Sequence, residues 1–412
     1  MTPLIDAKRR RGVRLFIFIT IFLDMVGIGL IIPVLPALLT DVGHVDLGRA
    51  AQISGAMFAT YSVAQFIMGP VLGNLSDAFG RRPLLLLAIG GMAADYVLCA
   101  LAPSLSVLFL GRLIAGVCGA SYVIANAVLA DITPPEDRAA AFGMVGAAFG
   151  LGFVIGPGVG GLLGEFGPRV PFWTAAGVSA VNFCIGYFAL PESLSAENRR
   201  KFDWRRANPF GAFKVFRTYP TVLPLSIVTA LFFFGSAVYP TIWPFWGMAR
   251  FGWSEAGVGI TLMGFGIVQS IMQGGLSGPL VRRFGERRVA LMGLISATIA
   301  AVGYGFADSL LVVLVLLIIH GPEGLIHPML MGLASREVPE NAQGELQGGM
   351  SAIMNLVMLF GTIFYSQTFG FFMSDRAPVQ SPSASFFIAA GILAVTLVTF
   401  VRMQKAHRAK AD

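Results

Sequence analysis

Residues 73–83 read GNLSDAFGRRP, and residues 278–288 read GPLVRRFGERR. One offset of 205 residues aligns the matching positions, which are Gly73/Gly278, Leu75/Leu280, Phe79/Phe284, Gly80/Gly285 and Arg82/Arg287. The same offset pairs Pro134 with Pro339 and Gly143 with Gly348 in a second part of each half. Because two separated regions share one offset, we infer that the chain arose by internal duplication.

Long apolar runs surround both of these short polar stretches. Hydrophobic residues make up 56% of the 412 residues and charged residues only 12%, about half the charged fraction usual in soluble domains. Runs of roughly 20 or more residues carry few or no charges, and a helix of that length crosses the ~30 Å hydrocarbon core of a bilayer. The runs lie near 15–39, 53–75, 83–102, 105–130, 139–164, 171–190, 220–246, 256–281, 288–307, 309–334, 344–373 and 383–403. We therefore predict an all-α membrane protein with twelve transmembrane helices, the first of which is retained because it is longer than the core of a signal peptide.

The Lys and Arg residues predict the orientation, because they concentrate on the cytoplasmic side of a membrane protein. They gather in the N-terminal tail, in the run from Arg199 to Arg217, in the turn from Arg282 to Arg288 and in the tail from Arg402 to Lys410. The opposite face holds only Arg49, Arg169, Arg250 and Arg376. Both termini are therefore predicted to be cytoplasmic. This topology and contact with membrane lipid account for the net charge of +7. The charge therefore does not require a nucleic-acid partner.

The polar segment 191–219 divides the apolar runs six and six. We predict an N-terminal six-helix bundle at residues 1–190, a cytoplasmic linker at 191–219 and a C-terminal six-helix bundle at 220–412. Two repeats with the same orientation are related by an axis along the membrane normal, which places a substrate cavity at their interface near the midplane.

The motifs of soluble enzymes are missing from the sequence. Cys99, Cys118 and Cys184 all lie in apolar runs without metal-ligand spacing, so they are expected to be small core residues. The sequence contains no Gly-rich phosphate loop, zinc motif or nucleophile elbow. We therefore expect neither a cofactor nor a metal, and no enzymatic activity.

Several motifs resemble those of the major facilitator superfamily. Residues 73–83 look like its cytoplasmic signature loop, and LGRLIAG at 110–116 resembles its fourth-helix arginine motif. The fifth-helix antiporter motif is matched by Gly143, Gly152, Gly156, Pro157, Gly160 and Gly161. Residues 33–36 fit the first-helix motif of the twelve-helix drug/proton antiporters. The wider run 23–36 and the pair Asp95-Tyr96 are similar to the tetracycline exporters in particular.

This resemblance implies a proton-coupled antiporter that exports lipophilic or amphipathic small molecules by alternating access, of the drug-efflux and antibiotic-resistance type. It also implies a monomer in the inner membrane of a bacterial cell. The alternative is a proton symporter or a facilitator for a small metabolite.

The resemblance also suggests residues that gate the transport path. Gly73 and Gly80 permit the tight turn of the signature loop. In the family an acid such as Asp77 latches the outward-facing gate, together with neighbouring arginines and a helix N-terminus of the other half. Arg81 or Arg82 is then expected to pair with Asp131, and Gly156 with Pro157 to kink the fifth helix. The alternative for Asp77 is a solvated residue that only marks topology.

Ionisable residues inside the apolar runs are candidates for proton coupling, because each costs at least ~2.5–3.5 kcal/mol at the bilayer centre unless it is paired or wetted. Counted along their helices, Asp95 and Arg112 lie at the same depth, so an ion pair between them is expected. Asp24 is the candidate proton carrier; alternatively, it stabilises a helix break near Gly27 and Gly29. His320 and Glu323 share a helical face. They form either a coupled titrating pair or a structural polar cluster at a kink.

The second half departs from the tetracycline exporters. Gln269 and Ala297 stand where that family has a histidine in helix eight and an acid in helix nine, which argues against tetracycline as the principal substrate. The expected cavity is aromatic and has few fixed charges, which suits a lipophilic solute. Its candidate substrate-binding residues, some of which could instead face lipid, are Tyr61, Gln65, Tyr122, Asn126, Phe233, Tyr239, Trp243, Gln269, Gln273 and Asn355.

Overall fold

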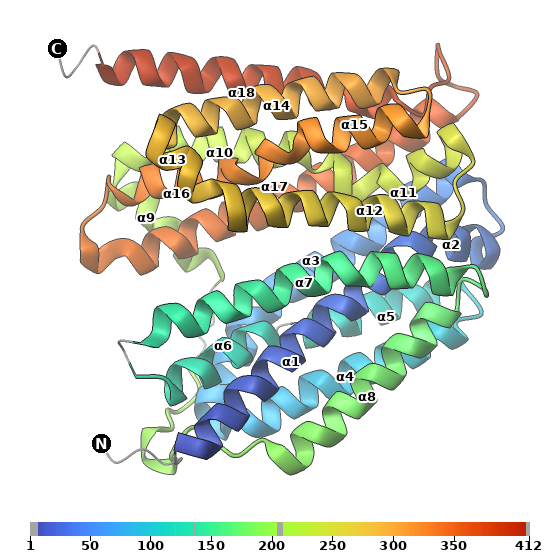
Figure 1. Cartoon of the computed structure of the whole chain (residues 1–412). Coiled ribbons are helices and arrows are strands. Elements are labelled where there is room, and N and C mark those ends of the chain that lie inside the picture. The colour runs from blue at the N-terminus through green and yellow to red at the C-terminus, as the bar shows by residue number, and fades with distance from the viewer. Residues whose placement is uncertain (1–6, 120, 135–136, 204–208, 409–412) are drawn as a thin grey trace. The chain divides into compact units, whose positions relative to one another are not determined.

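The computed structural model describes residues 7–119, 121–134, 137–203 and 209–408. Their regular structure is helical, and twelve helical spans among them are long and apolar enough to cross a membrane (Figure 1). Each span overlaps one predicted run, so the prediction of a twelve-helix membrane protein is confirmed. The cytoplasmic location of the termini stays a prediction. Residues 204–208 of the predicted linker and Lys410 of the basic tail lie outside the described residues.

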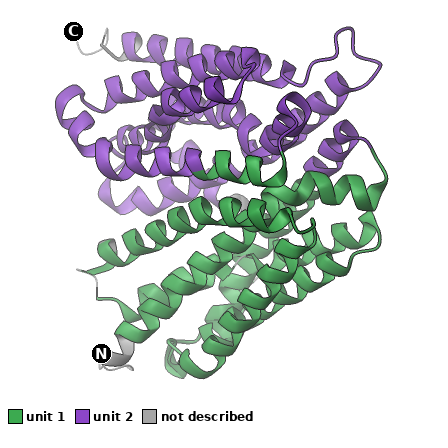
Figure 2. Ribbon diagram, turned by 45° about the vertical axis from the view of Figure 1, so that its right-hand side comes forward, with its two compact units in different colours: residues 1–45, 57–209, 254–263 green, residues 46–56, 210–253, 264–412 purple. Residues whose placement is uncertain are grey.

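The chain forms two compact units (Figure 2). Unit 1 comprises residues 1–45, 57–209 and 254–263. It contains α1 (Ala7–Ile31), η1 (Ile32–Val34), α2 (Leu35–Gly43), most of α3 (Leu47–Phe79), α4 (Arg81–Leu101), α5 (Leu105–Cys118), α6 (Ser121–Ile132), α7 (Arg138–Gly164), α8 (Val170–Ala189), η3 (Ala196–Asn198) and the first part of α12 (Glu255–Ser270).

Unit 2 comprises residues 46–56, 210–253 and 264–412. It contains the start of α3, α9 (Lys214–Thr218), η5 (Pro220–Val222), α10 (Leu223–Ser236), α11 (Val238–Phe251), the rest of α12, η6 (Ile271–Leu276), α13 (Ser277–Phe284), α14 (Glu286–Phe306), α15 (Leu310–His320), η7 (Gly321–Leu325), α16 (Ile326–Ser335), η8 (Glu340–Ala342), α17 (Gln343–Met373) and α18 (Ala384–Arg408). The turn η4 (Pro209–Phe213) begins at the boundary between the units.

Close helix packing in unit 1 depends on the glycines of α7. A Cβ atom added to Gly160 would lie 2.3 Å from the Leu30 carbonyl oxygen, and one on Gly156 would lie 2.8 Å from the Gly29 Cα atom. The backbones of α1 and α7 therefore touch along this stripe, as small residues allow in membrane helices. The turn η1 interrupts α1 where Pro33 stands, because proline has no N–H for the helical ladder.

Two helices of unit 2 are interrupted by irregular turns, and these two turns pack against each other. The 3₁₀ turn η7, which begins at Gly321 and contains Pro322, lies between α15 and α16. The π-helical turn η6 lies between α12 and α13 and packs against η7. Such interruptions expose backbone groups and reorient side chains, and they are frequent at functional sites. Tertiary contacts thus bring the two irregular turns of this unit together.

Each unit also contains the start of a helix from the other half of the sequence. At the start of α3, Gln52 packs on Gly370 and Gly55 on Ser366, both in α17. At the start of α12, Gly259 packs on Gly161 of α7. The division into residues 1–190, 191–219 and 220–412 therefore stays a proposal about the sequence repeat rather than a description of the compact units.

Candidate functional site

A buried ion pair joins α4 and α5 in unit 1. The Asp95 side chain has 0% exposure, and its Oδ2 atom lies 3.0 Å from Arg112 Nη2. The Cys99 thiol, one turn after Asp95 on α4, donates to Asp95 Oδ1 at 3.4 Å. The expected pair is therefore present, because the helical depth of both residues could be counted along the sequence. The contact from Cys99 was not predicted, since its spacing pointed only to a core residue.

Asp24 on α1 has a different environment. The Ser121 hydroxyl at the start of α6 donates to Asp24 Oδ2 at 2.9 Å. None of the described cations forms an ion pair with this carboxyl. The nearby Gly27 faces the Tyr96 hydroxyl, which would lie 2.7 Å from an added Cβ atom, so it provides space for that ring. Asp24 is therefore held by a neutral donor, whereas Asp95 is held by a cation.

Tyr61 and Gln65 on α3 belong to the same region of unit 1. Gln65 Nε2 donates to the Tyr61 hydroxyl at 3.0 Å and to the Gly119 carbonyl oxygen at 3.3 Å. Tyr61 lies within electrostatic range of Arg112 and both acids, Asp24 and Asp95. Two of the candidate substrate-binding residues thus share one environment with the ionisable residues of this unit.

A second buried acid lies in unit 2, at the η7 interruption. Glu323 Oε2 contacts His320 Nε2, and the Ser236 hydroxyl of α10 donates to Glu323 Oε1. The other ring nitrogen of His320, Nδ1, lies 3.4 Å from the Tyr304 hydroxyl, and the Tyr239 ring lies 4.3 Å from the imidazole ring. His320 and Glu323 are buried. The prediction that they share one face is confirmed, and Ser236 is an unpredicted member of the cluster.

Two amide side chains of the α12–η6 segment approach η7 beside this acid. A Cβ atom on Gly324 would lie 1.7 Å from Gln269 Oε1 and 3.1 Å from Gln273 Nε2. A larger residue at 324 would displace both amides from these positions. The glutamine that replaces the exporters' histidine is therefore adjacent to the turn that carries Glu323.

The remaining candidate substrate-binding residues have other surroundings. Trp243 is buried in an aromatic core with Trp246, Tyr304 and Phe386. The Phe233 ring lies 5.3 Å from the His327 ring. No described contact joins Asp24 or Glu323 to Tyr122, Asn126 or Asn355. Asn126 donates to the Tyr122 carbonyl oxygen.

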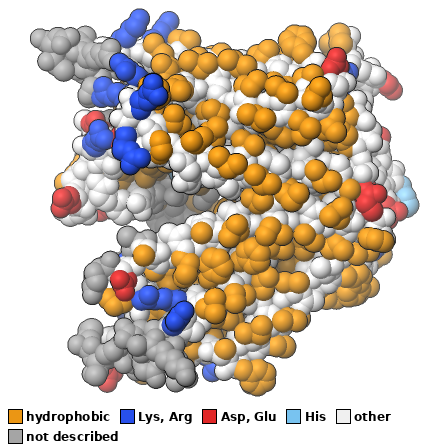
Figure 3. Space-filling model, in the orientation of Figure 1, with side chains coloured by type: hydrophobic (Ala, Val, Ile, Leu, Met, Phe, Trp, Pro, Cys, Tyr) orange, Lys and Arg blue, Asp and Glu red, His pale blue; other side chains and the backbone are white. Residues whose placement is uncertain are grey.

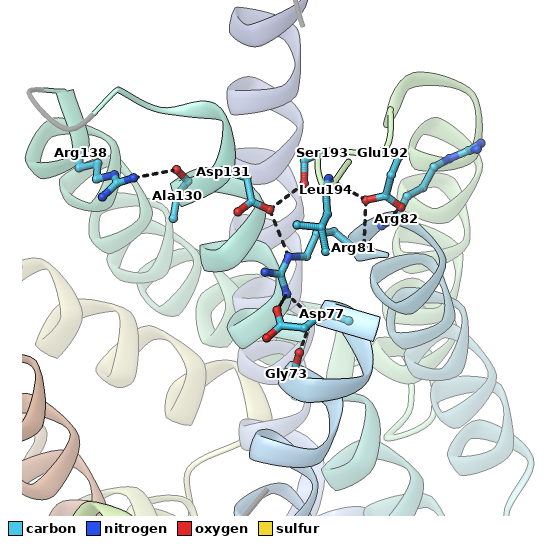
Figure 4. A network of polar contacts seen from close by, with 11 residues as sticks. Gly73, Asp77, Arg81, Arg82, Ala130, Asp131, Arg138, Glu192, Ser193 and Leu194 are labelled. Atoms are coloured by element: carbon cyan, nitrogen blue, oxygen red, sulfur yellow. Dashed lines mark hydrogen bonds and ion pairs between the residues drawn. The ribbon is translucent and has the colours of Figure 1, made fainter. Parts of the chain in front are cut away.

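The signature loop holds a charged network in unit 1 (Figure 4). Arg81 Nη1 lies 2.5 Å from Asp77 Oδ1, and Arg81 Nε lies 3.1 Å from Asp131 Oδ2. Of the two predicted partners of Asp131, Arg81 is therefore the one in contact. Arg82 instead donates to the Tyr187 carbonyl oxygen at 2.7 Å. Gly80 has φ 104°, which favours glycine, and Gly73 lies one turn before Asp77 on α3.

The start of the linker docks onto this loop. Glu192 accepts the backbone N–H groups of Arg81 and Arg82 at 2.9 and 3.3 Å, so its carboxylate satisfies orphan donors at the N-terminus of α4. Ser193 Oγ donates to Asp131 Oδ2 at 3.2 Å. The Arg200 N–H donates to the Asp77 carbonyl oxygen at 3.0 Å. This segment therefore braces the loop, although the sequence indicated only a polar linker.

The duplicated turn in unit 2 carries the same pattern with the charges reversed. The offset of 205 residues places Arg282, Glu286 and Arg336 at the positions of Asp77, Arg81 and Asp131. Arg336 Nη2 lies 2.8 Å from Glu286 Oε1. No described residue forms an ion pair with Arg282. This pair could have been found by applying the sequence offset to all three charged positions.

The sequence and the fold are similar to those of known proteins. The family model described as Major Facilitator Superfamily matches residues 17–362 and, in a second match, residues 225–412. The chain is 38% identical to "Tetracycline resistance protein, class C" of Escherichia coli, over 84% of this chain and 86% of that protein. It is 29% identical to "Multidrug resistance protein 2" of Bacillus subtilis (strain 168), over 86% of this chain and 88% of that protein.

A similar solved structure is that of a bacterial homolog to the human lysosomal transporter Spinster, in an inward-facing and occupied conformation. It has a TM-score of 0.79 at 16% identity, over 97% of this chain and 98% of that one, and it supports the fold alone. With the family match over most of the sequence and the relatives at more than 30% identity, the chain belongs to the major facilitator superfamily.

Proposed function

We propose that this multi-pass inner-membrane protein exports lipophilic or amphipathic compounds in exchange for protons, as a drug-efflux antiporter. The observation that carries the proposal is an acid in the membrane-spanning part of each unit, the half-buried Asp24 in unit 1 and the buried Glu323 in unit 2. Acids at such depth are costly unless they are paired or wetted, and in membrane proteins they mark transport pathways. The relatives, which are named tetracycline and multidrug resistance proteins, support the same class of transporter.

In unit 1 we assign the exchangeable proton to Asp24 rather than to Asp95. The Arg112 guanidinium balances the charge of the buried Asp95 carboxylate, so this pair is best described as a fixed structural element. Asp24 has a hydroxyl donor from Ser121 and no described cation. An unpaired carboxyl in a low-dielectric site is cheaper to bury with its proton, so its charge can change during transport.

In unit 2 we assign a coupled proton site to His320 and Glu323. Their side chains are in contact, so one proton shared between them changes the charge of the pair as a whole. Gln269 and Gln273 lie along η7 beside this pair, and we assign to them the polar contacts with the substrate. Binding of a solute there would alter the hydration of the pair, which links the solute to the proton.

The gate residues keep the roles that the family resemblance suggests. We propose that Asp77, Arg81 and Asp131 stabilise one conformation of the cytoplasmic side, with Glu192 bracing the loop. Gly156 and Pro157 supply the close contact between α7 and α1.

Transport in proteoliposomes tests the function. The purified protein is reconstituted with a pH gradient and offered tetracycline, a cationic lipophilic dye and an anionic amphiphile. We expect at least one of these compounds to move against the proton flux and to collapse the gradient as it moves. Movement in the same direction as the protons would establish a symporter instead, and movement indifferent to the gradient would establish a facilitator.

A further inference from the structure

A group of cations lies where α14 begins and α18 ends, on the same side of unit 2. Gln404 Nε2 of α18 approaches the Arg287 carbonyl oxygen of α14 at 3.5 Å, which places these helix ends next to each other. Arg288, Arg402 and Lys405 are exposed there. No described residue forms an ion pair with any of the three. Figure 3 shows Lys and Arg side chains gathered over this end of α13, α14 and α18.

Each helix continues from its cation into an exposed apolar stripe. On α14, Met292, Ile295 and Ile299 follow Arg288 at steps of four, three and four residues, so they share its helical face. On α18, Val395 and Val398 precede Arg402 in the same way. The two helices pack directly against each other. Arg288 and Arg402 therefore each stand at the end of an exposed apolar stripe, on two helices that are neighbours.

The preference of basic residues for the cytoplasmic side does not by itself explain this group. The equivalent turn in unit 1 has the same predicted topology, yet its arginines are engaged, Arg81 by two carboxylates and Arg82 by a carbonyl oxygen. In unit 2 the acid of the turn, Glu286, is already paired with Arg336. Within the duplicated turn, the basic residues are thus engaged in unit 1 and left without a described acid at Arg288 in unit 2.

We propose that Arg288, Arg402 and Lys405 bind the headgroup phosphate of one anionic phospholipid, whose acyl chains lie along the exposed faces of α14 and α18. Charge complementarity selects an anion, and the adjoining apolar stripes select a lipid over a free phosphate or an acidic protein. This site is independent of the transport path and of the proposed function.

Lipid binding to the full chain is measured by native mass spectrometry in detergent, with phosphatidylglycerol and phosphatidylcholine as probes. The variant Arg288→Gln/Arg402→Gln/Lys405→Gln removes the site. Each cation near a membrane surface contributes about fivefold to anionic lipid binding, so the affinity for phosphatidylglycerol should fall on the order of a hundredfold. The control Lys201→Gln/Lys214→Gln/Arg217→Gln removes three other exposed cations and should leave the affinity within about twofold.

The single variants Arg288→Gln and Arg288→Lys keep the test decisive if the triple variant does not fold. The first should lose about fivefold in affinity, and the second should retain most of the binding. Equal losses in the triple variant and its control would overturn the proposal, as would equal binding of phosphatidylcholine. Competition by millimolar inorganic phosphate as effective as that by the lipid would show a phosphate site and refute the assignment to a lipid.

Discussion

Replacing Arg112 by glutamine would leave Asp95, whose side chain has 0% exposure, without its described cation. Removing one partner of a buried ion pair costs about 3–5 kcal/mol, because the other charge stays buried and unpaired. The Arg112 side chain keeps 18% of its surface exposed, and the Cys99 thiol still donates to Asp95. Both features place the expected loss in the free energy of unfolding near the lower limit, at about 3 kcal/mol.

Asp95→Asn in the Arg112→Gln background should recover most of this loss, because a neutral amide costs far less to bury than a carboxylate. Unfolding in mixed micelles by titration with a denaturing detergent measures both variants. Arg376→Gln, the same substitution at an exposed residue, serves as the control and should change stability by less than about 0.5 kcal/mol. If Arg112→Gln behaved like Arg376→Gln, or if Asp95→Asn brought no recovery, the pair would not stabilise the fold as argued.

Five further variants test three other acids, Asp24, Glu323 and Glu165. Asp24→Asn should abolish gradient-driven transport in proteoliposomes with an unchanged folded yield, while Ser121→Ala should cost about 1 kcal/mol of stability and retain transport; full transport by Asp24→Asn would exclude Asp24 as the carrier. Glu323→Gln should change the substrate affinity or its pH dependence, and His320→Ala should shift the apparent pKa of substrate binding. Binding profiles identical to the parent, combined with lower thermal stability, would show that the pair only braces the η7 turn. Glu165, at the exposed end of α7, accepts hydrogen bonds from the Ser254 hydroxyl and the Ala256 N–H, which hold its pKa below the usual 4.5. The stabilisation is therefore present above about pH 4.5 and is lost as the pH falls through the lower folded pKa. Glu165→Gln should reduce the loss of thermal stability between neutral and acidic pH. If the variant lost as much stability at acidic pH as the parent, these hydrogen bonds to Glu165 would not stabilise the fold.

The sequence alone determined the twelve membrane spans and the duplication. The bilayer requires a fixed length of apolar helix, and that requirement is local to each run of residues. The pairing of Asp95 with Arg112 was also predictable, because depth in a helix follows from counting residues along it. The resemblance of residues 73–83 to a family loop was sufficient to locate the charged network of Arg81 and Asp131.

Only the tertiary structure decided which polar groups meet across helices. Ser121 and Ser236 are ordinary small residues in sequence, and the rotation of each helix about its axis decides that they contact Asp24 and Glu323. The Gln269 amide lies against Gly324 of η7, in space that a side chain at residue 324 would occupy. The aromatic neighbours of Trp243, among them Trp246 and Tyr304, likewise come from other parts of unit 2 or other turns of its helix. Helices that are apolar on every side carry no periodicity that distinguishes an inward face from a lipid face, so these contacts depend on packing between residues far apart in the chain.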